Sequence, residues 1–116
     1  WARMRSKWNH AHGVTNVWQE PAVRGSERVK SQGLKALHMN QKPLRLIDQI
    51  IAASTDPGDV VWEPFGGLCS AAVSSLRSGR HCYASEVIPD FYSAAVKRLN
   101  EESAIVKSPT SHANRA

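Results

Sequence analysis

Long apolar runs, cysteines and nucleotide-binding glycine motifs are all scarce in this chain of 116 residues. No apolar run approaches the ~18 residues of a membrane-spanning helix, and no signal-peptide pattern follows the N-terminus. The two cysteines, Cys69 and Cys82, form no CxxC pair, which argues against a zinc site and indicates a reducing compartment such as the cytoplasm. The fingerprints GxGxxG and GxxxxGK[ST] are absent, so NAD and nucleoside triphosphates lose support as ligands. His10 and His12 lack a third ligand at a usual spacing, so we expect no metal site.

The charge of the chain is concentrated in its first third. Hydrophobic residues make up 41% of the sequence, which is enough for a packed core, and the formal net charge is +5. Residues 1–40 hold seven bases and two acids, whereas residues 41–116 hold eight of each. A basic segment beside a neutral one predicts a polyanionic partner, with a solvated basic surface as the alternative. The chain opens on Trp1, which suggests a fragment of a longer protein, although a processed chain would look the same.

The hydrophobic pattern predicts a βαβ unit preceded by one helix. An apolar stripe that includes Leu44, Ile47 and Ile51 predicts the helix over residues 43–55. The run of residues 60–62 is typical of a strand buried on both faces, with Trp62 in the core. Strand, glycine turn, helix and strand in that order predict two parallel strands. The remaining predicted segments are a short strand over residues 14–18, a helix over 70–78, a strand over 81–85, a helix from residue 89 and a mobile tail over 103–116.

The glycine turn after the first strand has the chemistry of a ligand site. Gly66 and Gly67 lack a Cβ, so a ligand can approach the backbone closely, and the next helix points its N-terminus at the same place. Glu86 ends the second strand 19 residues after Gly67, close to the ~20-residue spacing at which an acidic residue binds ribose hydroxyls. This arrangement favours a nucleoside-containing ligand over a simple tight turn.

Two motifs resemble the amino-DNA methyltransferases. Residues 38–43, His-Met-Asn-Gln-Lys-Pro, are similar to the family's His-Pro-Thr-Gln-Lys-Pro element. Residues 63–70, Glu-Pro-Phe-Gly-Gly-Leu-Cys-Ser, are similar to its Asp-Pro-Phe-x-Gly-Ser-Gly-Thr element. The strand ending at Glu86 and the helix after it resemble the next motif, so the resemblance covers roughly residues 14–100.

The resemblance implies an α/β chain that forms part of a Rossmann-like methyltransferase fold, with parallel strands and flanking helices. It implies S-adenosylmethionine as the cofactor and methyl transfer to N6 of adenine or N4 of cytosine in double-stranded DNA. A cognate restriction endonuclease would be a second partner in a restriction–modification system. A lysine and polar side chains suit the carboxylate of the cofactor's methionine end, and the implied residues there are Asn40, Gln41 and Lys42. The residues implied around the methionine and sugar are Glu63, Phe65, Gly66 and Gly67, with Glu86 on the ribose hydroxyls.

Three departures from the family bear on the site, whereas Met39 and Asn40, in place of proline and threonine, are tolerable replacements. Glu63 replaces an aspartate, and Cys69 replaces the last glycine of the turn, where a side chain would narrow the approach to the backbone. The family's catalytic element contains Pro-Pro followed by an aromatic residue that stacks on the flipped base, and this chain has no Pro-Pro pair. We therefore assign no catalytic residue and expect no methyl transfer by this chain alone.

The expected organisation is that of the C-terminal half of a permuted methyltransferase. Residues 1–37 would end the target-recognition region, where basic side chains contact phosphates, residues 38–102 would bind the cofactor, and residues 103–116 would form the tail. Two alternatives stay open: a methyltransferase acting on RNA or another substrate, and a non-catalytic DNA-binding module with a vestigial α/β part.

Overall fold

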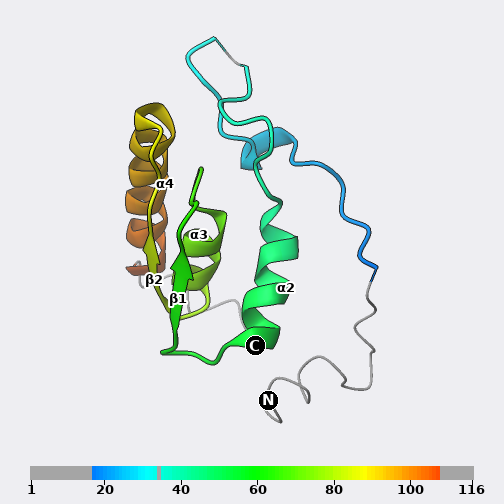
Figure 1. The fold of residues 1–116 in the computed structure, drawn as a ribbon, viewed down its shortest axis with the longest axis vertical. Helices are drawn as coiled ribbons and strands as arrows, with labels where there is room; N and C mark the ends of the chain where they lie inside the picture. The colour runs from blue at the N-terminus through cyan, green and yellow to red at the C-terminus, as the bar shows by residue number, and fades with distance from the viewer. Residues whose placement is uncertain (1–16, 34, 108–116) are drawn as a thin grey trace.

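The computed structural model describes residues 17–33 and 35–107 as a small α/β unit (Figure 1). Its elements in chain order are the 3-10 helix η1 (Gly25–Glu27), α2 (Leu44–Ser54), β1 (Val60–Glu63), α3 (Ser70–Arg77), β2 (His81–Ala84) and α4 (Pro89–Lys107). The two strands are parallel, with Val61 opposite Cys82, and α3 connects them. The predicted βαβ unit is confirmed.

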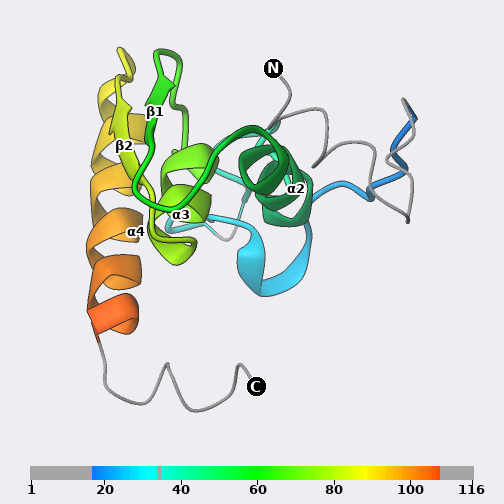
Figure 2. The same ribbon diagram turned by 90° about the horizontal axis from the view of Figure 1, so that it is seen from below.

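The core lies between one face of the two strands and helices α3 and α4. It consists of Cys69, Ala72 and Ala95, with Cys82 and Leu99 packed against them. Small side chains let α3 approach both its neighbours closely, and α2 packs against its other side (Figure 2). The layer order therefore brings the segments before α2, α3 and α4 to the carboxyl ends of the strands.

The opposite face of the strands is bare among the described residues. Val60 is 61% exposed, Trp62 64% and Tyr83 66%. The prediction that residues 60–62 are buried on both faces, with Trp62 in the core, is thus wrong for this chain. A continuous apolar run indicates two covered faces in a parallel sheet, and here α3 and α4 cover one face only.

The helix boundaries differ from the predicted ones for local reasons. Pro43 is the N-cap of α2, with φ −65°, and the helix begins at Leu44. Residues 103–107, assigned to the tail, continue α4, because the chain meets no proline between residues 89 and 109 and the buried carboxylate of Glu102 binds Arg77 on α3. Of the strand predicted over residues 14–18, Val17 and Trp18 are not in a strand and the rest lies outside the described residues. In the part of the chain that the structure describes, no helix is long and apolar enough to cross a membrane.

Candidate functional site

A hollow of about 170 Å³ lies where the 38–43 turn meets the glycine turn. Seven of the eight predicted site residues line it: Asn40, Gln41, Lys42, Glu63, Phe65, Gly66 and Gly67. The other lining residues are His38, Ile47, Leu68 and Ser70. Two motifs 20 residues apart in sequence therefore form one concave surface at the carboxyl end of β1, where open α/β sheets bind ligands.

The two glycines of the turn are required by the backbone. A Cβ at Gly66 would lie 2.8 Å from Sγ of Cys69 and 3.2 Å from the carbonyl oxygen of Ser85. Gly66 also donates its N–H to that oxygen at 2.7 Å, so the turn is pinned to the end of β2. Gly67 has φ +54°, and its Cβ would stand 3.3 Å from Nε2 of His38. A side chain would thus be crowded at Gly66 and strained at Gly67, and glycine keeps the backbone open to the hollow.

Cys69 shows why a glycine is typical at its position. It has φ 55° and ψ 47°, the left-handed conformation that a side chain disfavours. Its thiol packs in the core, and Cys69 does not line the hollow between the two motifs but does line a neighbouring hollow with Glu86. Burial raises the pKa of this thiol to about 11, so it is protonated at neutral pH.

Glu86 binds the glycine turn from the far side. Its Oε2 accepts the N–H of Gly67 at 2.7 Å and its Oε1 accepts the N–H of Ile88 at 2.8 Å. These backbone hydrogen bonds, that of Ile88 foremost, lower the pKa of the Glu86 carboxyl, so it is ionised at neutral pH. Glu86 is the one predicted residue that does not line the first hollow; it lines a second one of about 190 Å³ beside Tyr92.

Glu63 caps the helix that follows the turn. Its two carboxylate oxygens accept the N–H groups of Ala71 at 3.4 Å and Ala72 at 3.2 Å, which otherwise lack partners at a helix N-terminus. Burial raises the pKa of Glu63, opposed by these hydrogen bonds and by the charge of Arg98. The carboxylate is therefore engaged in fixing α3 as well as lining the hollow.

The 38–43 turn is fastened by Gln41. Its side chain is buried, its Oε1 accepts the N–H of Val29 at 2.9 Å, and its Nε2 donates to the carbonyl of Glu27 at 2.7 Å. The amide of Gln41 is thus used to attach the turn to the segment around η1. Asn40 and Lys42 on either side are exposed, which leaves these two side chains accessible to a ligand.

His38, outside the predicted set, is part of this site. Its Nδ1 accepts the N–H of Asn40 at 3.1 Å, so Nε2 carries the proton when the ring is neutral. Its ring lies 4.5 Å from that of Phe91 on α4 and covers Gly67. The first position of the motif was a signal for this residue, whereas nothing in the sequence pairs it with Phe91. His10 and His12 lie outside the described residues.

The segment that contains the two motifs matches known proteins. A profile of a DNA methylase family, of the N6/N4 type, matches residues 2–97 and so contains the whole hollow and Glu86. The chain belongs to this DNA methylase family. It is 32% identical over 93 residues to the DNA adenine methyltransferase YhdJ of Escherichia coli strain K12, which covers 80% of this chain and 30% of that protein. It is 34% identical over 86 residues to the Type II methyltransferase M.HinfI of Haemophilus influenzae, which covers 74% of this chain and 24% of that protein. The chain thus spans less than a third of either relative.

Proposed function

We propose that residues 38–102 form the cofactor-binding part of a DNA methyltransferase. The complete enzyme would transfer a methyl group from S-adenosylmethionine to N6 of adenine or N4 of cytosine in DNA. The observation that carries this proposal is the single hollow formed by residues 38–43 and 63–70, two motifs of a DNA methylase family. The enclosing fold would be Rossmann-like, with the βαβ unit as one part of a larger parallel sheet.

The residues present fit one end of this cofactor. Site volumes for small ligands are typically ~300–1,000 Å³. The hollow of about 170 Å³ therefore suits the methionine end alone. The exposed ammonium of Lys42 matches its carboxylate, with Asn40 beside it, and Gly66 and Gly67 let it lie against the backbone. Glu86 stands on the other side of Gly67, where its remaining lone pairs can accept hydrogen bonds from ribose hydroxyls. The bound cofactor supplies an activated methyl group, and this chain's residues bind and orient it.

The bare sheet face supports the assignment to one half of an enzyme. Val60, Trp62 and Tyr83 present apolar surface that a parallel sheet ordinarily covers, and most of each relative lies outside the matched segment. We infer that the half with the Pro-Pro catalytic element packs there, and that this chain alone does not transfer methyl groups. Residues 1–37 would end the target-recognition region and contact DNA phosphates.

The position of Cys69 favours this proposal over a vestigial DNA-binding module. The alternative drew its support from a side chain expected to narrow the approach to the backbone, and Cys69 packs in the core and does not line the hollow proposed for the methionine end. A DNA substrate and two free thiols suit a reducing compartment that holds DNA, and we place the protein in the cytoplasm. A cognate restriction endonuclease is a further proposed partner.

Calorimetric titration of S-adenosylhomocysteine into the chain tests the cofactor site. We expect saturable binding that Lys42→Ala weakens about tenfold, since it removes a charge-assisted contact. Lys97→Ala, which removes an equally exposed lysine from α4, is the matched control and keeps the affinity. No heat and no thermal shift at millimolar ligand contradict the proposed cofactor site.

A further inference from the structure

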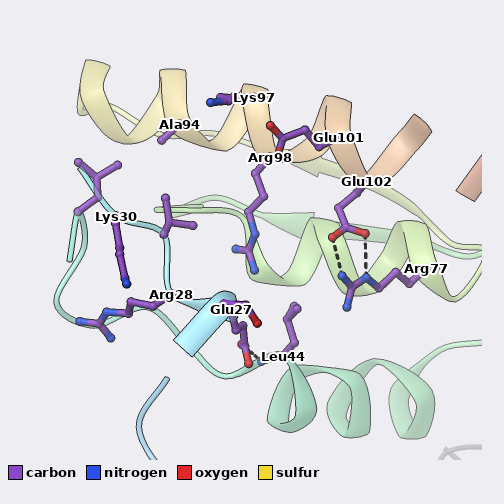
Figure 3. Close-up of a pocket in the computed structure, with 13 residues that line it drawn as sticks. Glu27, Arg28, Lys30, Leu44, Arg77, Ala94, Lys97, Arg98, Glu101 and Glu102 are labelled. Atoms are coloured by element: carbon purple, nitrogen blue, oxygen red, sulfur yellow. Dashed lines mark hydrogen bonds and ion pairs between the residues drawn. The ribbon is translucent and has the colours of Figure 1, made fainter. Parts of the chain in front are cut away.

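Arg98 connects the long helix α4 to the rim of the hollow. Its Nη1 donates to the carbonyl oxygen of Leu68 at 2.8 Å and to Oγ of Ser70 at 3.2 Å. Leu68 and Ser70 both line the hollow, whereas Arg98 approaches them from behind. Figure 3 shows its side chain extending from α4 toward α3, next to the cavity formed with the segment around η1.

Ser70 connects Arg98 to the 38–43 turn. Its side chain is buried, and its Oγ donates to the carbonyl oxygen of Lys42 at 3.2 Å. A hydroxyl has one proton to donate, so this bond and the one accepted from Arg98 have fixed directions. Arg98, Ser70 and Lys42 therefore form a chain of hydrogen bonds that joins α4, the glycine turn and the 38–43 turn.

The environment of Arg98 differs from that of the other arginine that bridges α3 and α4. Arg77 is paired with Glu102 by two hydrogen bonds, of 2.9 and 2.5 Å (Figure 3). Arg98 is half-buried, and within the described part of the chain it donates hydrogen bonds to two neutral oxygens, those of Leu68 and Ser70. Burial lowers its pKa, while the charges of Glu27 and Glu102 favour its cationic form. Its contacts with the rim of the hollow distinguish Arg98 from Arg77, whose guanidinium binds a carboxylate.

We infer that Arg98 is a positioning residue for the cofactor site, acting through Ser70 on the turn that carries Lys42. It fixes the distance between the two motifs, so that the ammonium of Lys42 and the backbone of the glycine turn face one ligand. This inference rests on the proposed function. A variant that lacks the guanidinium of Arg98 should therefore lose the shape of the hollow even where it keeps the fold.

The test compares Arg98→Met with Arg77→Met in the whole chain. Each variant removes one guanidinium from the pair α3 and α4: that of Arg98 is half-buried, and the side chain of Arg77 is 41% exposed. Thermal unfolding measures how far each variant lowers stability. We expect Arg98→Met to weaken S-adenosylhomocysteine binding about tenfold, as for loss of a charged hydrogen bond, and Arg77→Met to change it less than twofold. Arg98→Lys, which keeps a charged donor, restores part of the affinity.

A double-mutant comparison and amide exchange separate positioning from stability. Ser70→Ala and Arg98→Met act through one chain of hydrogen bonds, so the double variant loses no more affinity than the weaker-binding single variant. Amide hydrogen exchange without ligand should accelerate in residues 38–43 and 66–70 for Arg98→Met, but not for Arg77→Met. The same readout in Ser70→Ala applies where Arg98→Met fails to fold.

The outcomes distinguish the two proposals. If the wild-type chain binds the ligand and Arg98→Met binds it within twofold, or if affinity merely follows stability in both arginine variants, the positioning role is wrong. If the wild-type chain does not bind, the proposed function fails. Exchange that is unchanged around the hollow in Arg98→Met overturns the positioning role in either case.

Discussion

The N–H of Gly67 and the carboxylate of Glu86 are joined by a hydrogen bond of 2.7 Å across 19 residues of sequence. This bond attaches the glycine turn after β1 to the end of β2. The same carboxylate accepts the N–H of Ile88 just before α4 begins at Pro89, so one side chain holds both the glycine turn before α3 and the segment before α4. Glu86 is therefore part of the turn's own structure before any ligand is bound.

Glu86→Ala should weaken S-adenosylhomocysteine binding at least about tenfold, because it removes a charged acceptor and frees the turn. Glu86→Gln keeps one acceptor oxygen and should lose less. Glu101→Ala, which removes an exposed carboxylate on α4, is the control in the same calorimetric titration. An affinity unchanged in Glu86→Ala would remove Glu86 from the site.

The two carboxylates of the site predict pH dependences of opposite sign. The pKa of Glu86 is lowered from 4.5, so its contribution to stability is present above that value and lost as the pH falls through the folded pKa. The pKa of Glu63 is raised from 4.5, so stability falls as the pH rises from that value through the folded pKa. Denaturant unfolding between pH 3 and pH 7 should show less acid loss in Glu86→Gln than in wild type. In Glu63→Gln the free energy of unfolding should depend less on pH just above pH 4.5 than in wild type. Identical pH profiles in all three proteins would refute both assignments.

At position 69 the smaller substitution should be the more stable one. In the left-handed conformation of Cys69 a side chain costs ~1 kcal/mol that glycine avoids, whereas the two substitutions lose similar packing. We expect the free energy of unfolding of Cys69→Gly to be ~1 kcal/mol higher than that of Cys69→Ala. Chemical denaturation of both variants measures this difference. A less stable glycine variant would show that packing of the Cβ, and not the backbone conformation, governs this position.

Because Trp62 lies on the exposed sheet face, we expect its substitution to change stability little. Trp62→Ser should change the unfolding free energy of this chain by less than ~0.5 kcal/mol, as for other surface substitutions, although the residue lies in a strand. Leu99→Ala, which truncates a side chain packed on the core, should cost ~2 kcal/mol or more. A large loss in Trp62→Ser would mean that this face is already covered in the chain as it stands.

The sequence predicts what depends on local pattern. The βαβ unit followed from one apolar run, two glycines and the following helical period, and the grouping of seven site residues followed from two short motifs. The exposure of Trp62 did not follow, because burial of a strand depends on what covers it. Gln41 and Arg98 were beyond local pattern as well, since their partners at residues 27–29 and 68–70 are set by packing between elements distant in sequence.

The hollow between the two motifs is proposed to bind the cofactor. Nuclear magnetic resonance of the ¹⁵N-labelled chain, titrated with S-adenosylhomocysteine, tests it most directly. We expect saturable shifts of the amides of Lys42, Gly66, Gly67 and Glu86, whereas those of Lys30 and Glu101 at the separate cavity beside η1 should not move. Shifts centred on Lys30 and Glu101, or no saturable shift at Gly66 and Gly67, would contradict it.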